Sequence, residues 1–311
     1  MQHFEHRFTA MGGPCTLRLD CDHQAAAMQA LAAAEEEVRR LERKYSRYLE
    51  DSLASVINHR AGSGVLTAID AETAGMLHYA QTLWEQSDGL FDLTSGVLRR
   101  AWNFRSGQLP TAAAVQSLLP LVGRDRVCWD DSGVLLRDPG MELDFGGCVK
   151  EYAADAVAAV LRDAGMAHAL VDLGGDMAAT GGRADGAPWR VGISSPARPD
   201  RALAGVELVA GGLASSGDYE RCIEIDGQRY GHILDPRSGW PVAGLVAVSV
   251  SAPQCLVAGS SATLAMLKPE DEALSWLASL GLPWVAQDRA GGLHGSPSGA
   301  QATQPVMPSP P

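Results

Sequence analysis

A Gly-Gly turn between two charged side chains is the first place where the sequence suggests chemistry. Gly146 and Gly147 follow a carboxylate, Asp144, and precede a cation, Lys150. The pattern predicts a short strand over 142–144 and a helix after the glycines that runs to about residue 163. Glycines let a ligand approach the free N–H groups at a helix start, where the helix dipole favours anions such as phosphate. The turn is therefore a candidate phosphate-binding site.

The same residues also fit an ordinary turn between a strand and a helix, which is the simpler interpretation of this stretch alone. The glycines do not follow the GxGxxG pattern of dinucleotide-binding turns. No Lys-Ser/Thr pair follows them as in a P-loop. Two well-known phosphate-binding motifs are thus excluded.

Two further clusters combine glycines with polar side chains. One holds Ser216, Gly217 and Asp218; the other runs from Gly231 to Gly239 and includes His232 and Asp235. Hydroxyl groups, glycines and an Asp in a loop suit contact with a ligand, but they equally suit turns in which Asp and Ser bond their own backbone. For His232 alone, a packed and hydrogen-bonded histidine is the simpler interpretation.

The elements that must position these clusters are mixed strands and helices. Without regular βαβ alternation, this mixture indicates an α+β fold. Residues 51–58 form either a polar connection or a short capped helix. Strands are predicted over 16–20, 127–129, 134–137, 169–173, 189–193 and 245–250, with a hairpin over 222–230. Helices are predicted over 22–48, 71–86, 111–119, 254–267 and 270–280.

Composition restricts the possible partners. The net charge of −12 opposes nucleic-acid binding, which needs a cationic face. Six cysteines without CxxC spacing favour reduced thiols in the cytoplasm. We see no signal peptide, no lipobox and no apolar run long enough to span a membrane. We expect a folded domain over residues 1–290 and a disordered Gly/Ser/Pro-rich tail over 291–311.

Taken together, these segments resemble the FAD:protein FMN transferases, the ApbE-type flavin transferases. The similarity spans roughly residues 11–280 and follows the order of the family's motifs. The matching segments are Met11-Gly12, Ser46-Arg47-Tyr48 with Ser52 and Asn58, Gly89 to Thr94, Leu143 to Asp155, Leu170 to Asp176, Ser216 to Glu220, and His232 to Pro241.

The resemblance implies a two-lobed α+β chain with mixed sheets and a flavin cleft between the lobes. It implies a Mg²⁺-dependent reaction in which FMN passes from FAD to a Ser or Thr hydroxyl of an acceptor protein carrying an FMN-binding domain, with release of AMP. The implied catalytic residues are His232, Thr263 and Lys150, and the implied metal site comprises Gly147, Gly259 and Thr263. The implied cofactor contacts are Met11, Tyr48, Leu90, Phe91, Asp92, Asp144, Lys150, Ser216, Gly217, Asp218, Ile233 and Asp235.

The sequence departs from the family pattern at two positions. Gly259 stands where the family usually has an Asp that binds magnesium, and Glu151 stands where it usually has a glycine. Mg²⁺ prefers hard, charged oxygen ligands. Two interpretations follow: an active transferase with a rebuilt metal site, or an FAD-binding carrier, chaperone or sensor that has lost transfer chemistry. If the missing carboxylate is the only defect, Gly259→Asp should raise activity; if Glu151 already supplies it, the new Asp should crowd the site.

Overall fold

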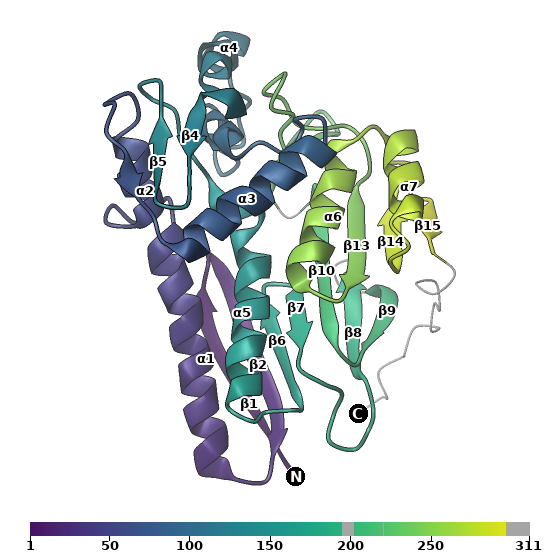
Figure 1. Ribbon diagram of the computed structural model, residues 1–311. Helices are drawn as coiled ribbons and strands as arrows, with labels where there is room; N and C mark the ends of the chain where they lie inside the picture. Colours follow the sequence, from purple (N-terminus) through teal and green to yellow (C-terminus); the bar gives the residue numbers. More distant parts are fainter. Residues whose placement is uncertain (195–201, 220, 297–311) are drawn as a thin grey trace.

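The computed structural model describes residues 1–194, 202–219 and 221–296. Its main feature is an eight-stranded antiparallel sheet with the order β1-β2-β6-β7-β10-β13-β14-β15 (Figure 1). These strands are β1 (Gln2–Ala10), β2 (Gly13–Cys21), β6 (Ala169–Leu173), β7 (Asp176–Ala179), β10 (Gly211–Gly217), β13 (Ala247–Ala252), β14 (Trp284–Gln287) and β15 (Leu293–Gly295).

Helices α1 (Gln24–Tyr45), α5 (Val149–Asp163) and α6 (Cys255–Leu267) pack side by side against this sheet (Figure 1). Helix α1 buries one stripe that includes Leu31, Val38 and Leu41, as its amphipathic sequence predicts. Helix α6 carries no charged residue and is buried on nearly every side, because it lies between the sheet, α5 and α7. Two further helices are α3 (Ala71–Gln86) and α7 (Glu270–Ser279), which packs against α6.

Smaller elements complete the fold. A three-stranded sheet has the order β3-β5-β4, and two hairpins pair β8 with β9 and β11 with β12. The strands are β3 (Thr67–Ala68), β4 (Val127–Trp129), β5 (Gly133–Leu136), β8 (Trp189–Ser194), β9 (Ala202–Leu208), β11 (Cys222–Ile225) and β12 (Gln228–Gly231). The short helices are α2 (Leu53–His59), α4 (Ala112–Leu118), and the 3-10 turns η1 (Leu93–Arg100), η2 (Leu119–Leu121), η3 (Arg124–Arg126) and η4 (Phe145–Gly147).

The α+β prediction is confirmed, and several helix starts lie where capping residues indicated. Asp70 accepts the N–H of Thr73 at the start of α3, and Thr111 accepts that of Ala114 in α4. Ser52 caps α2 in the same way, so residues 51–58 contain the short capped helix rather than a polar connection.

Four sequence expectations are wrong. Residues Gln2–Ala10 form strand β1, which was not predicted, and Ser216-Gly217 lies in strand β10 rather than in a loop. Residues 142–144 form no strand. The predicted tail begins too early, because β15 pairs with β14 beyond residue 290. The remainder of that tail, 297–311, and Glu220 lie outside the described residues.

Within the described part of the chain, the structure contains no helix that is both long enough and apolar enough to cross a membrane.

Candidate functional site

The segment before the Gly-Gly turn is held by side chains rather than by a neighbouring strand. The amide of Asn58 donates to the carbonyl of Leu143 at 3.0 Å and accepts its N–H at 2.7 Å. Arg47 forms ion pairs with Glu142 at 2.7 Å and with Asp144 at 3.0 Å. Backbone groups satisfied in this way need no strand partner, which is why the predicted strand is absent.

The turn itself is a short 3-10 helix that leads into α5. The Asp144 carboxylate accepts the N–H of Gly146 at 2.8 Å, and Arg99 approaches it at 3.7 Å. A Cβ atom at Gly147 would lie 3.1 Å from the ring of Phe91, so a glycine suits this close contact. The predicted cofactor contacts Asp144 and Phe91 therefore meet at the start of α5.

Lys150, the second residue of α5, joins this turn to a second Gly-Gly turn. Its Nζ atom lies 2.8 Å from Asp176 Oδ2 and donates to the carbonyl of Gly174 at 3.3 Å. Asp176 is only 2% exposed and also accepts the N–H of Ser215 on β10 at 3.4 Å. Lys150 thus compensates a buried carboxylate while its side chain remains about one-third exposed.

His232 lies in a positively charged environment. Burial, together with the charges of Arg99 and Arg221, lowers the pKa of its imidazole to about 4, and Lys150 acts in the same direction. Its Nδ1 atom is buried and has no hydrogen-bond partner among the described residues. Arg221 also approaches the β1–β2 turn, 3.9 Å from a Cβ built at Gly12. The imidazole is therefore neutral near pH 7 and able to accept a proton.

Helices α5 and α6 meet in a fixed antiparallel register. The carboxylate of Asp155 accepts the N–H groups of Cys255 and Leu256, at 2.8 and 2.9 Å, at the first turn of α6. One turn back along α5 and one turn on along α6, Glu151 lies against Gly259: a Cβ there would be 2.8 Å from Glu151 Oε1. The spacing of four residues on both helices explains both contacts.

The Glu151 carboxyl is buried without a matching partner. Glu151 is 7% exposed, and its Oε2 atom has no hydrogen bond within the described chain. Burial, followed by repulsion from Asp176, raises the pKa of this carboxyl well above its usual range, although Lys150 opposes the shift.

Thr263 lies one turn beyond Gly259 on α6. Its hydroxyl is 3.1 Å from that of Ser216 on β10. No group of three or more His, Cys, Asp or Glu side chains gathers as a metal centre in the described ranges, so any cation there needs backbone, hydroxyl or ligand oxygens as well.

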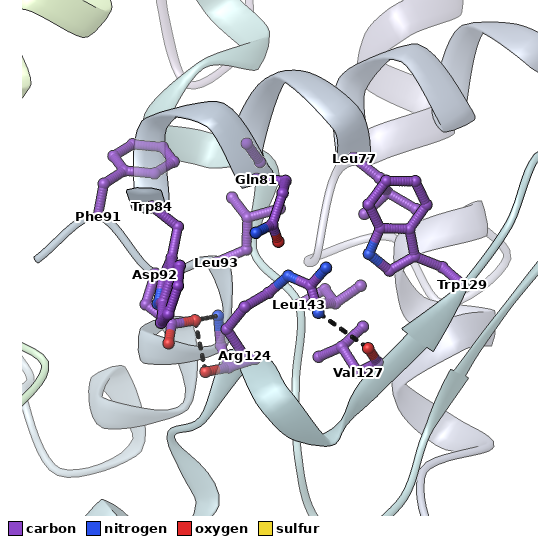
Figure 2. Close-up of a pocket in the computed structure, with 12 residues that line it drawn as sticks. Leu77, Gln81, Trp84, Phe91, Asp92, Leu93, Arg124, Val127, Trp129 and Leu143 are labelled. Atoms are coloured by element: carbon purple, nitrogen blue, oxygen red, sulfur yellow. Dashed lines mark hydrogen bonds between the residues drawn. The ribbon is translucent and has the colours of Figure 1, made fainter. Parts of the chain in front are cut away.

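Several predicted cofactor residues make contacts within their own segments. Asp92 accepts the N–H and hydroxyl of Thr94 at 2.8 and 2.6 Å, and burial raises the pKa of its carboxyl. Figure 2 shows the side chain of Asp92 beside Arg124. Asp235 holds Arg237 at 2.8 Å inside its own turn. Leu90 is buried in the core, whereas the ring of Tyr48 is 80% exposed.

The remaining predicted contacts lie close to the His232 segment or at the β1–β2 turn. Asp218 is 1% exposed and pairs with Arg229 and Arg289, both at 3.3 Å. The Cβ atom of Asp218 would lie 2.7 Å from a Cβ built at Gly231, next to His232, so only glycine fits there. Met11, at φ 52°, occupies the hairpin turn before Gly12. Ile233 accepts the N–H of Val242 at 3.0 Å.

Two hollows in the described part of the chain do not contain His232 or Lys150. One, of about 20 Å³, is lined by apolar side chains with Asp92 and Arg124 (Figure 2); that is room for about one water, and not for a flavin. The other, of about 260 Å³, lies between Arg47, His59 and Arg100. Since the polar groups gather at the start of α5, we place the candidate site there.

Sequence reasoning did not assign Asp176, Arg99 or Arg221 to this site. Asp176 directly follows a second Gly-Gly pair, a signal comparable to the first. Arg99 and Arg221 carry no local signal, because only the fold brings them to His232.

The fold and the site together define an α+β protein with a candidate anion-binding site at a glycine-rich helix start. A family model described as the ApbE family matches residues 11–285. The chain therefore belongs to the ApbE family.

Individual relatives agree with this assignment. An FAD:protein FMN transferase of Klebsiella pneumoniae (strain 342) is 32% identical over 244 residues, which cover 77% of this chain and 74% of that protein. The ApbE protein of Thermotoga maritima has a crystal structure that superposes with a TM-score of 0.87 at 27% identity, covering 96% of this chain and 98% of the other. The apo form of the Pseudomonas stutzeri flavinyl transferase ApbE gives 0.85 at 27% identity, covering 97% and 96%.

Proposed function

We propose that this protein is a Mg²⁺-dependent transferase that moves the FMN part of FAD onto a Ser or Thr hydroxyl of an acceptor protein. Its family membership and the names of its relatives support flavin transfer. The observation that carries the proposal is the gathering of Lys150, Arg99 and Arg221 around the neutral His232, beside the glycine-rich start of α5.

This arrangement suits a dinucleotide with a pyrophosphate at its centre. Cations and the N-terminus of α5 would neutralise the phosphates. The exposed ring of Tyr48 and the partly buried Met11 offer apolar surface on which the flavin or adenine ring can stack, and the buried Phe91 would support the site from the core. Asp144, Ile233, Ser216 and Gly217 complete the set of proposed contacts, together with Leu90, Asp92, Asp218 and Asp235.

The proposed reaction is a substitution at phosphorus. The acceptor hydroxyl oxygen forms a bond to the FMN phosphorus, and the bond from that phosphorus to the bridging oxygen of AMP breaks. His232 accepts the hydroxyl proton, for which its neutral imidazole and unpartnered Nδ1 are suited. AMP leaves with the bridging oxygen and its electron pair, and FMN remains attached as a phosphoester.

The residues present fit a magnesium ion. Mg²⁺ commonly binds through one or two carboxylates and the phosphates of its substrate, rather than in a cage made of protein alone. The carbonyl of Gly147, the hydroxyl of Thr263 and a carboxylate beside Gly259 would hold it. When bound, the ion would neutralise charge on the pyrophosphate and the departing AMP.

The alternative function, an FAD carrier or sensor without transfer chemistry, depended on the loss of a carboxylate at Gly259. The Glu151 carboxylate beside that glycine supports the transferase instead. We further propose an acceptor of the FMN-binding domain type and a cytoplasmic location, which the six free cysteines fit.

Incubation of the full chain with FAD, Mg²⁺ and a flavin-accepting domain tests the proposal. Mass spectrometry of the acceptor should show the addition of FMN, and chromatography should show an equal amount of AMP. Chelation of the metal, and separately His232→Asn, should each abolish both products. An acceptor that keeps its unmodified mass while the protein binds FAD would favour the carrier function instead.

A further inference from the structure

We propose that Glu151 is the charged ligand of the divalent cation in this protein, delivered from α5 into the space beside Gly259 of α6. The inference rests on the proposed function for the identity of the substrate, but its own argument concerns the packing of two helices.

The first observation is a buried acid with an unused oxygen. Glu151 is 7% exposed, yet its Oε2 atom lacks a hydrogen-bond partner among the described residues. A buried carboxylate costs free energy unless it is paired or coordinates a metal. Lys150 is the neighbouring cation, and it also pairs with Asp176 and donates to the carbonyl of Gly174.

The second observation is that α6 has a glycine at the position that faces this side chain. A Cβ atom at Gly259 would lie 2.8 Å from Glu151 Oε1 and 2.9 Å from Cδ, closer than such atoms approach in proteins. Glycine inside a helix is otherwise unfavourable by about 1 kcal/mol relative to alanine. The glycine therefore accommodates the carboxylate.

The third observation is the surroundings of the carboxylate. Thr263 lies one turn along the same face of α6, and Gly147 one turn back from Glu151 toward the start of α5. Asp176 lies close enough to be the strongest charged influence on Glu151. A carboxylate, a hydroxyl and a backbone carbonyl are therefore available within one helical turn of Glu151 or Gly259 along the chain, and Mg²⁺ prefers oxygen ligands of these kinds.

A purely structural role for Glu151 is the competing explanation. Acidic residues in the first turn of a helix stabilise it through the helix dipole, and Glu151 is the third residue of α5. Such residues gain this stabilisation at the surface, however, and do not require burial against another helix. A structural role also predicts no change in cation affinity upon substitution.

The test measures cation binding directly. Mn²⁺ is titrated into the full chain with and without FAD, and the free ion is followed by electron paramagnetic resonance. Glu151→Gln keeps the shape of the side chain but removes its charge, and we expect cation affinity to fall by about tenfold or more. Asp163→Asn is the matched control, because it removes an exposed carboxylate from the far end of the same helix; its affinity should equal that of the wild type.

An exchange of the two positions tests the geometry. Gly259→Asp alone should weaken Mn²⁺ binding and lower the melting temperature, because its side chain collides with Glu151. Glu151→Ala alone should also weaken binding. In Glu151→Ala/Gly259→Asp the new carboxylate occupies the vacated space, and Mn²⁺ affinity should recover toward the wild-type value.

The outcomes separate this inference from the proposed function. Wild-type protein that binds FAD and Mn²⁺, with unchanged Mn²⁺ affinity in Glu151→Gln, would overturn the role of Glu151 alone. Wild-type protein that binds no FAD would contradict the proposed function, whatever the variants do. Failure of the double variant to bind Mn²⁺ better than Glu151→Ala, when both are folded, would show that the space beside Gly259 is not the cation site.

Discussion

The two carboxylates that α5 presents to α6 are one helical turn apart, yet their environments are opposite. Asp155 accepts two backbone N–H groups at the start of α6. Glu151 faces the glycine of the next turn of α6, and one of its oxygens has no hydrogen bond within the described ranges. Burial raises the pKa of both carboxyls, but only in Asp155 do hydrogen bonds from the backbone of another helix oppose that shift.

The difference separates two uses of a buried acid. Asp155, on α5, caps the start of α6, so its carboxylate oxygens are already bound within the fold. Glu151 has no comparable partner, and its Oε2 atom is available to a ligand. The first carboxylate also fixes the register that places the second.

A third carboxylate next to α5, that of Glu72, is compensated in another way. Glu72 of α3 binds Arg40 at 2.6 Å and Lys44 at 2.6 Å, and it accepts the hydroxyl of Tyr152 at 3.1 Å. Its charge is compensated by cations rather than by backbone groups. The three acids thus represent a helix cap, a salt-bridge centre and a proposed ligand.

Asp155→Ala should produce the largest effect, because it removes the carboxylate that is fully hydrogen-bonded to α6. The change leaves two N–H groups at the start of α6 without their acceptor, and we expect a loss of about 2–4 kcal/mol in the free energy of unfolding. Urea denaturation measures it, with Asp163→Asn as the control. A loss below that of the control would mean that the cap does not stabilise α6.

Lys150→Ala should have the next largest effect, on ligand binding. Loss of a charge-assisted contact with the pyrophosphate is expected to weaken FAD binding by about tenfold or more, equivalent to about 1.5–3 kcal/mol. Fluorescence quenching of the flavin measures the affinity. Because the same change removes the partner of Asp176, a melting curve must first show that the variant is folded. Unchanged FAD affinity in a folded variant would restrict Lys150 to its ion pair.

Glu72→Gln should have the smallest effect and a distinct pH dependence. Hydrogen bonds from Arg40, with those from Lys44, lower the pKa of Glu72 to about 2 in the folded protein. A lowered folded-state pKa contributes stability that is present above the unfolded pKa, about 4.5, and is lost as pH falls toward 2. The stability difference between wild type and Glu72→Gln should therefore be constant near neutral pH and shrink below about 4.5. Denaturation at several pH values checks this, and a difference that grows in acid would contradict it.

Local signals explain which parts of the fold could be predicted. Helix α3 has the predicted bounds because Asp70 caps its start, and α1 follows its apolar stripe. Strand β10 could not be recognised, because its small residues resemble a loop. The structure gives the reason for one of them: a Cβ at Gly212 would lie 2.8 Å from the Cβ of Cys255 on α6.

The candidate site shows the same limit. The sequence predicted that Gly147, Lys150 and His232 belong to one site, and it named Glu151 as a possible replacement for a missing acid. It could not establish where Glu151 points, because Glu151 and Gly259 are distant in the chain. Their contact depends on the α5–α6 register, which Asp155 sets through backbone groups that no sequence motif displays.

The collision between position 259 and Glu151 also has a consequence for laboratory evolution. In the wild-type background, a library randomised at position 259 alone should return mainly glycine, because every other side chain begins with a Cβ that meets Glu151. Once Glu151 is shortened, the same library gains access to alanine, serine and aspartate. The two positions therefore define a path on which the order of substitutions matters, and the acid can move between the helices only if the side chain on α5 is shortened first.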